Sequence, residues 1–281
     1  MESLISKSRT VLVTGTSSGI GRGLCQALIK KGYKVFGTVR NQKDATELKN
    51  EFGENLDALL VDVTNEKQVI RAKEKIKNYL GGKSLTALIN NAGIATLGPV
   101  EFLPTYDFKK QLDTKILGTF LCTKIFLPLL GTDNNTNGKP GRIINISSIL
   151  GGKIGSPFMS GYCASKHAVE AFSESLRREL KPYGIKVIIV APGSVSTPIW
   201  KEVEKQKEQN KYNKTKYGIP FKKILNSLES FDRNSLSMKK LTNIIIQSIE
   251  IKNPKIRYNP TNDPIQKIWP YIPKKIMDSF F

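Results

Sequence analysis

The sequence is poor in the residues that bind metals and form disulfides. It has three cysteines and a single histidine among 281 residues. The cysteines, Cys25, Cys122 and Cys163, are far apart in the sequence and lack the spacing of a metal site. Scattered cysteines of this kind are typical of free thiols in a reducing compartment. We therefore expect no metal, no disulfide framework and a cytoplasmic protein.

Long apolar runs and acidic residues are also scarce. No segment approaches the roughly 20 consecutive apolar residues of a membrane span, and the N-terminus shows no basic-then-apolar signal. The 24 acidic residues are outnumbered by 44 lysines and arginines, which gives a formal net charge of +20. Such an excess attracts phosphate groups, whether of nucleic acid, anionic lipid or a nucleotide cofactor. No nucleic-acid-binding motif is recognisable, so nucleic acid is not an expected partner.

The sequence does contain a repeated alternation of short apolar runs and helical patterns. Runs of strand length, rich in β-branched residues, occur at 10–14, 34–39, 58–62, 86–90, 142–147 and 186–191. Nearly continuous apolar character is expected of parallel strands that are covered on both faces. Helical patterns occur at 19–31, 65–79, 106–130 and 161–181. The alternation predicts an α/β fold with a Rossmann-type doubly wound parallel sheet, formed as a single domain by residues 1–281.

A glycine-rich turn follows the first predicted strand. The segment TVLVTGTSSGIG has Gly15, Gly19 and Gly21 between this strand and the first predicted helix. Glycine permits a turn with positive φ and lets the backbone approach a pyrophosphate closely. The N-terminus of the helix then offers free N–H groups to the phosphates. In this context the glycines predict a dinucleotide-binding site.

The end of the second predicted strand bears on the choice of cofactor. Folds that prefer NAD usually have an acidic residue there, which binds the ribose 2′-hydroxyl. Residues 35–42 contain no Asp or Glu, and Arg40 is the nearest charged group. A guanidinium suits a 2′-phosphate, although a solvated loop arginine is the other interpretation. We therefore predict a preference for NADP(H), with NAD(H) as the alternative.

With these features the chain resembles the short-chain dehydrogenase/reductase family over roughly residues 1–200. The matching motifs, in order, are TGxxxGxG from Thr14, the pair DV at 62–63, NNAG at 90–93, YCASK at 162–166 and PGSVSTP at 192–198. The resemblance implies a cofactor site made of Thr14, Gly15, Ser17, Ser18, Gly19, Ile20, Gly21, Arg40, Asp62, Val63, Asn90, Ala92, Gly93, Tyr162, Lys166, Pro192, Gly193, Val195 and Thr197.

Tyr162 and Lys166 are the predicted catalytic pair. Residues four apart on a helix lie on the same face, and an ammonium beside a phenol lowers its pKa from about 10. Tyr162 can then give a proton to a carbonyl oxygen or remove one from an alcohol. The resemblance implies that Lys166 also holds the nicotinamide ribose. His167 is rotated by about 100° around the helix from Lys166, so we predict that it is a structural or surface residue.

Two positions depart from the pattern of the family. The serine that steadies the substrate oxygen is predicted to be Ser148, which precedes Tyr162 by one residue more than usual; Ser147 is the alternative. At Lys115 the family usually has an asparagine, in a helix that supports a water relay to the catalytic lysine. A lysine cannot accept a hydrogen bond, and its charge opposes that of Lys166. We expect either that Lys115 turns away from the site or that the proton relay is rebuilt.

The last third of the chain is expected to bind the substrate. A lysine-rich segment near 199–235 predicts a helical lid over an apolar pocket, with apolar residues Trp200, Ile219, Phe221, Ile224 and Leu225. The basic tail 252–281 carries Trp269, Tyr271, Ile272, Ile276, Phe280 and Phe281. This composition fits contact with an anionic membrane surface, which would make the protein membrane-associated. Packing on the core or at a subunit interface fits it equally, and the family resemblance implies a homo-oligomer.

The predicted function is that of an NADP(H)-dependent oxidoreductase. It would transfer a hydride between nicotinamide and a secondary alcohol, ketone or aldehyde of a small hydrophobic substrate. The chain is similar to family members that act on steroids, retinoids and other lipophilic alcohols or ketones. Two alternatives stay open: a non-catalytic dinucleotide-binding sensor or scaffold, suggested by Lys115, and a nucleic-acid-binding protein, suggested by the net charge.

Overall fold

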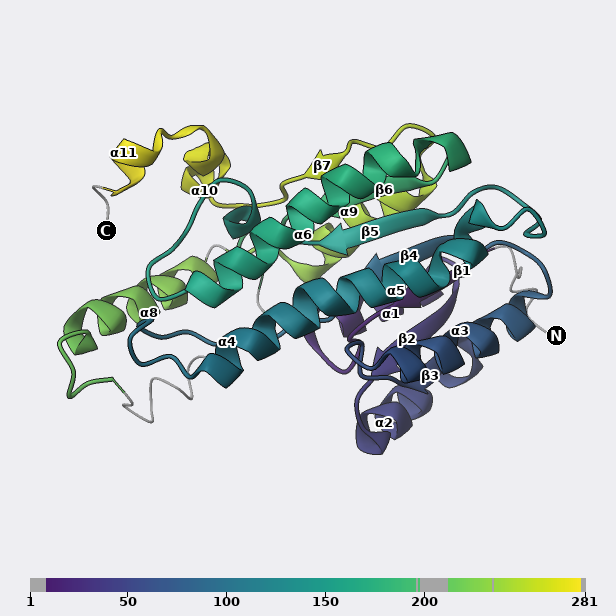
Figure 1. Ribbon diagram of the computed structural model, residues 1–281, viewed down its shortest axis with the longest axis horizontal. Helices are drawn as coiled ribbons and strands as arrows, with labels where there is room; N and C mark the ends of the chain where they lie inside the picture. Colours follow the sequence, from purple (N-terminus) through teal and green to yellow (C-terminus); the bar gives the residue numbers. More distant parts are fainter. Residues whose placement is uncertain (1–8, 196, 198–211, 234, 279–281) are drawn as a thin grey trace.

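Seven parallel strands form one twisted sheet at the centre of the protein (Figure 1). The computed structural model describes residues 9–195, 197, 212–233 and 235–278. Within them the strand order is β3-β2-β1-β4-β5-β6-β7. The strands are β1 (Thr10–Val13), β2 (Lys34–Val39), β3 (Leu56–Leu60), β4 (Ala87–Asn90), β5 (Arg142–Ile146), β6 (Lys186–Val190) and β7 (Arg257–Tyr258). The order reverses direction between β1 and β4, which confirms the predicted doubly wound topology.

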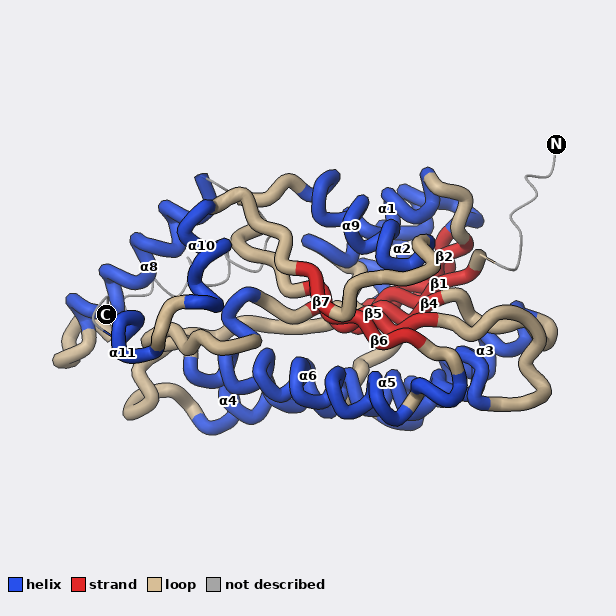
Figure 2. Tube along the Cα trace, turned by 90° about the horizontal axis from the view of Figure 1, so that it is seen from above, coloured by secondary structure: helices blue, strands red, loops and turns tan. Residues whose placement is uncertain are grey.

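Helices cover both faces of the sheet (Figure 2). One layer consists of α1 (Gly19–Lys30), α2 (Gln42–Phe52) and α9 (Met238–Glu250). The other contains α3 (Glu66–Leu80), α4 (Thr105–Leu112), α5 (Gly118–Leu127) and α6 (Ser160–Glu179). Short 3-10 turns are η1 (Gly53–Asn55), η4 (Ile149–Gly151), η5 (Lys181–Tyr183) and η6 (Trp269–Tyr271). Both faces of the inner strands are therefore buried, as their continuous apolar character predicts.

A single long helical stretch, predicted over 106–130, runs from α4 to α5 and beyond. It is interrupted by two π-helical turns, η2 (Asp113–Leu117) and η3 (Pro128–Thr132). Contrary to the sequence-based expectation, Thr105–Thr132 is long and apolar enough to cross a membrane by length and composition. However, 56% of its most apolar window is buried in the protein, as in the core helix of a soluble protein. The turn η2 faces the functional site, where π-helical turns are frequently found.

The substrate-binding third is partly described. The predicted lid contains α8 (Gly218–Arg233), whereas Trp200 and the rest of 198–211 lie outside the described residues. Phe221 and Leu225 of α8 are buried in an apolar cluster with Met159 and Tyr162. The chain ends with α10 (Pro264–Ile268) and α11 (Lys274–Asp278), and Trp269 and Ile272 pack against the same cluster. Phe280 and Phe281 also lie outside the described residues.

Candidate active site

A cavity of about 1760 Å³ lies along the carboxyl ends of the parallel strands. Its walls come from the segments that follow β1 to β6, from η2, from α6 and from the end of the chain. In open α/β sheets, ligands bind at this edge because the strand order reverses there and leaves a crevice. Most of the predicted site residues line this one cavity. They are Gly15, Ser17, Ser18, Gly19, Ile20, Arg40, Asp62, Val63, Ala92, Gly93, Ser148, Tyr162, Lys166, Pro192, Gly193, Val195 and Thr197.

The glycine loop has the shape that a pyrophosphate requires. Gly15 has a φ of +70°, and a Cβ there would lie 2.8 Å from the Cα of Ala92, so a larger residue does not fit. The Gly15 N–H donates to Thr38 Oγ1 at 2.9 Å, which fixes the loop to β2. The side chain of Ser18, at the N-cap of α1, does not cap the helix. The first N–H groups of α1 can therefore bind phosphate, and the residues present fit a dinucleotide.

Arg40 follows β2 directly and lines the same end of the cavity. Its side chain is exposed, and in the described part of the chain no carboxylate forms an ion pair with it. Asp62, at the end of the neighbouring β3 segment, accepts hydrogen bonds from the backbone and the hydroxyl of Thr64 at 2.9 and 2.7 Å. The Asp62 carboxylate is therefore already hydrogen-bonded within the turn that follows β3. Arg40 is thus the free charged group where the second ribose of a dinucleotide would lie.

Three predicted cofactor residues lie behind the cavity wall. Thr14 Oγ1 accepts from the N–H groups of Asn91 and Ala92 at 2.9 and 3.0 Å, which joins the two lining loops. A Cβ on Gly21 would lie 2.0 Å from the carbonyl oxygen of Gly15, so this glycine lets α1 pack on the loop. Asn90 Nδ2 donates to Asn145 Oδ1 at 2.8 Å. These residues hold the wall in place rather than line it.

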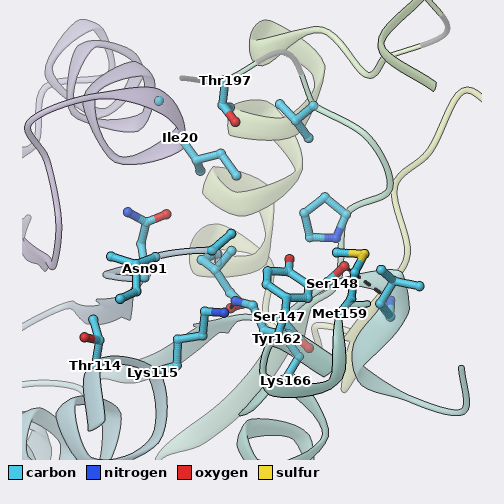
Figure 3. A pocket seen from close by; sticks show the side chains of 18 of the residues that line it. Ile20, Asn91, Thr114, Lys115, Ser147, Ser148, Met159, Tyr162, Lys166 and Thr197 are labelled. Carbon is cyan, nitrogen blue, oxygen red and sulfur yellow. Dashed lines mark hydrogen bonds between the residues drawn. The ribbon is translucent and has the colours of Figure 1, made fainter. Parts of the chain in front are cut away.

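The end of the cavity that holds the predicted catalytic residues is built by α6 and the segment after β5 (Figure 3). Ser148, Tyr162 and Lys166 are all buried there, and the Ser148 hydroxyl hydrogen-bonds the phenol of Tyr162. Ser147 Oγ donates instead to Glu170 Oε1 at 2.7 Å, behind the site. Of the two candidate serines, Ser148 is therefore the one that contacts Tyr162. Lys166 Nζ donates to the carbonyl oxygen of Ile146 at 2.7 Å.

Burial dominates the electrostatics of the pair. It raises the pKa of Tyr162 to about 12, against the hydrogen bond from Ser148, which lowers it. It also lowers the pKa of Lys166 to about 8, against the nearby charge of Glu170. The expectation of a lowered phenol pKa is therefore wrong for this structure, in which the net shift is upward. Lys166 Nζ lies 6.0 Å from the centre of the Tyr162 ring, and desolvation of the phenolate outweighs its charge.

Lys115 does not turn away from the site. It is only 2% exposed, lines the cavity, and points toward Tyr162 (Figure 3). Its Nζ lies 3.9 Å from the centre of the Tyr162 ring and has no hydrogen-bond partner. Burial, and next the charge of Lys166, lower the pKa of Lys115 well below its ordinary value. Of the two expectations for this residue, the one that moves it out of the site is wrong.

His167 and two further residues complete the description of the site. His167 Nδ1 hydrogen-bonds the backbone carbonyl of Cys163 at 2.9 Å within its own helix, away from the cavity lining. Asn91, overlooked within the NNAG motif, donates from Nδ2 to the carbonyl oxygens of Thr14 and Gly15 at 2.9 Å each. Thr38 was also overlooked, because its contact with Gly15 depends on β2 lying beside the turn after β1.

A family model described as short chain dehydrogenase matches residues 9–208. The chain belongs to this family. The dehydrogenase is 32% identical to NADPH-dependent 3-dehydrocapnine reductase of Ornithobacterium rhinotracheale, over 97% of this chain and 96% of the relative. It is 32% identical to retinol dehydrogenase 16 of Mus musculus, over 98% of this chain and 86% of the relative. The solved structure of ElxO with NADP bound superposes with a TM-score of 0.72 at 28% identity, over 90% and 95% of the two chains. The protein is thus an NAD(P)-dependent oxidoreductase.

Proposed function

We propose that this dehydrogenase uses NADPH to reduce the carbonyl group of a lipophilic ketone or aldehyde, with Tyr162 as the proton donor. The observation that carries the proposal is the position of the Ser148–Tyr162 pair in the cavity. The lining of the same cavity includes the glycine loop and a group of apolar residues. A carbonyl group held at this pair can therefore meet the dinucleotide while its apolar body is buried.

The apolar region of the cavity supports a lipophilic substrate. Many of the lining residues from η4, the segment before α6, α8 and the end of the chain are aliphatic or aromatic: Ile149, Leu150, Ile154, Phe158, Met159, Ile224, Trp269 and Ile272. The polar lining residues of the same segments are Ser156, Lys223, Ser227 and Gln266. Burial of an apolar ligand in such a region is favourable in proportion to the area removed from water. The relatives named for retinol and 3-dehydrocapnine are consistent with this substrate class.

The chemistry follows from the protonation states of the side chains. The dinucleotide, when bound, supplies the hydride. Ser148 and Tyr162 donate hydrogen bonds to the carbonyl oxygen, and Tyr162 releases its proton to that oxygen as negative charge develops. Burial raises the pKa of Tyr162 to about 12, so the phenol is protonated at neutral pH, the state that can donate to a carbonyl oxygen. Lys166, held by Ile146, stabilises the resulting phenolate and is positioned to bind the ribose beside it.

The preference for NADPH rests on Arg40. Its guanidinium is exposed, lines the cavity and has no carboxylate partner among the described residues. A guanidinium binds a phosphate through two parallel hydrogen bonds, and residues 35–42 contain no carboxylate that would accept from a ribose 2′-hydroxyl instead. A relative named as NADPH-dependent and the structure of ElxO with NADP bound are in line with this choice.

We also propose that the dehydrogenase takes its substrate from an anionic membrane. The elements α8, α10 and α11 lie at the same end of the molecule (Figure 1). Exposed apolar side chains occur on these elements and on η6: Ile219, Ile268, Tyr271 and Ile276. Exposed lysines accompany them, namely Lys222, Lys223, Lys267 and Lys275. Lys223 and Ile268 also line the cavity, so this face surrounds its mouth. Apolar side chains among lysines are typical of surfaces that bind anionic bilayers.

The substitution Tyr162→Phe tests the proposed reaction. NADPH oxidation is followed with a panel of hydrophobic ketones and aldehydes, and NADPH affinity is measured separately. Removing the proton donor is expected to lower kcat by a factor of about 100 or more while NADPH affinity changes little. Tyr106→Phe, at an exposed tyrosine of the same cavity, serves as the control. Near-normal turnover in Tyr162→Phe would contradict the mechanism, and tight NADPH binding without turnover of any substrate would favour the sensor.

A further inference from the structure

The side chain of Lys115 places a buried amine in the site, which lowers the stability of the fold. It is among the largest fully buried side chains of the described residues, and none of them forms a hydrogen bond with its Nζ. An unpaired polar group in such a place is unfavourable for stability, and an unpaired charge far more so. Its backbone carbonyl accepts from the Thr119 hydroxyl at 2.6 Å within the helical stretch. A purely structural role does not account for an amine at this position.

The backbone around Lys115 aims its side chain at the catalytic tyrosine. The π-helical turn η2 breaks the regular helix at 113–117, directly opposite α6. The Lys115 stem passes Gly93, where a Cβ would come within 3.5 Å of Lys115 Cε, an ordinary contact distance. Its Nζ then lies 3.9 Å from the centre of the Tyr162 ring, closer than the Nζ of Lys166 at 6.0 Å. A charge on Lys115 would thus lie over the face of the Tyr162 ring, nearer its centre than the charge of Lys166.

The surroundings of Lys115 favour the neutral amine in the resting site. From α6, the ionisable groups that face it are Tyr162, Cys163 and Lys166, and Glu170 acts one step further away through Lys166. From its own turn, Asp113 is bound to Lys109. Gly93, on the loop after β4, brings no charge. Among the described residues no carboxylate pairs with Lys115, so burial and the charge of Lys166 both oppose its protonation.

We propose that Lys115 is a positioning residue for the proton transfer, neutral while Tyr162 is a phenol and protonated while Tyr162 is a phenolate. This inference rests on the proposed function of the same site. When Tyr162 gives its proton to the substrate oxygen, the new alcohol leaves a phenolate behind. Lys115 takes up one proton from solvent, and its ammonium stabilises the phenolate across the ring face. When a second solvent proton restores the phenol, Lys115 releases its own proton again, so each reduction consumes one hydride and, in net, one solvent proton.

The first test follows the ionisation of Tyr162 by tyrosinate absorbance, without substrate or cofactor. The signal of Tyr162 is isolated by subtracting the titration of Tyr162→Phe. In the wild type, part of the tyrosinate absorbance of Tyr162 is expected to appear over the pH range in which Lys115 titrates, because Tyr162 and Lys115 are coupled. In Lys115→Met, which keeps the volume but has no charge, the rise is expected at a pH higher by about one unit or more. Lys115→Arg, whose charge cannot be released, is expected to show it at or below the wild-type pH.

The control is Lys124→Met, at an exposed lysine of α5 that pairs with Glu66. It removes one charge from the same helical stretch and is expected to leave the Tyr162 titration unchanged. An identical Tyr162 titration in the wild type and in Lys115→Met would overturn the inference. The Tyr162 titration could shift in Lys115→Met and not in Lys124→Met while the wild type reduces no carbonyl compound. That result would support the coupling of Lys115 to Tyr162 and contradict the proposed function.

The second test is the pH dependence of kcat for carbonyl reduction. With Lys115→Met the loss of turnover is expected to exceed the change in KM for NADPH, and to vary with pH across the range in which Lys115 titrates. A merely structural lysine would instead give the same fractional loss at every pH. Thermal unfolding further distinguishes the proposed role of Lys115 from a purely structural role. Lys115→Met removes an unpaired buried amine and is expected to raise the melting temperature, whereas a structural residue would lower it when replaced.

Discussion

Arg40 is the residue on which the choice between NADPH and NADH depends in the proposed function. Arg40→Ala is expected to raise KM for NADPH by a factor of about 10 to 100, because a charge-assisted hydrogen bond to the phosphate is lost. KM for NADH should change little. Arg40→Lys keeps the charge without the planar fork and should give an intermediate KM. Lys43→Ala, at an exposed position of α2, controls for the loss of one positive charge. Equal losses with both cofactors would count against the assignment.

At the same scale, the sequence could predict which side chains lie together but not their ionisation. Tyr162 and Lys166 could be paired because their spacing alone puts them on one helix face. The spacing could not show that the pKa of Tyr162 is raised. The cause of the shift is burial, which depends on the whole cavity. The orientation of Lys115 depends on a π-helical turn that no spacing in the sequence announces. The choice of Ser148 over Ser147 required the position of Glu170 on α6.

Among the elements, α6 and β7 are joined by an ion pair directly behind the site. Glu170 lies one helical turn after Lys166, and both of its oxygens accept from the guanidinium of Arg257 at 3.0 and 3.1 Å. The two side chains are only 13% and 24% exposed, so the pair is largely shielded from water. The hydroxyl of Ser147 donates to the same carboxylate, which connects the end of β5 to this pair. The pair thus fixes three elements around Lys166.

Removing one partner should therefore destabilise the protein. Arg257→Met leaves the Glu170 carboxylate buried without its cation, and the free energy of unfolding in urea is expected to fall by about 1–3 kcal/mol, a figure reduced for the partial exposure. Glu170→Gln in the same chain removes the unpaired charge and should recover part of the loss. Strictly additive losses in the double variant would show that the two side chains do not interact.

The elements themselves were predictable where the pattern is long. Six apolar runs gave six strands whose ends differ from the structure by two residues at most. The strand β7 was missed, since two residues cannot show a period. The helices α2 and α9 were missed as well, although Asn41 and Ser237 cap them with side-chain hydrogen bonds from Asp44 and Lys240. The helix α8 fell inside the predicted lid because its apolar residues are mixed with lysines.

On the scale of the whole molecule, strand order was predictable because right-handed crossovers leave few topologies for alternating strands and helices. How the last third of the chain folds over the cavity was not, since irregular segments there are held by scattered contacts such as those of Trp269 and Ile272. The single domain and the homo-oligomer stay predictions. The net charge of +20 is also a property of the whole chain, and it would draw the protein to anionic surfaces over several ångströms.

Vesicle flotation tests whether the face around the cavity mouth binds membranes. The full chain is expected to float with vesicles containing phosphatidylserine, to stay behind with vesicles of phosphatidylcholine alone, and to bind less at high salt. Tyr271→Asp and Ile276→Asp each put a negative charge on this face and should weaken binding, because both side chains are exposed there. Ile70→Asp makes the same charge change on α3, at the opposite end of the molecule in Figure 1, and should bind normally. Equal weakening by Ile70→Asp would mean that the net charge alone attracts the vesicles, and no binding by the wild type would contradict the membrane proposal.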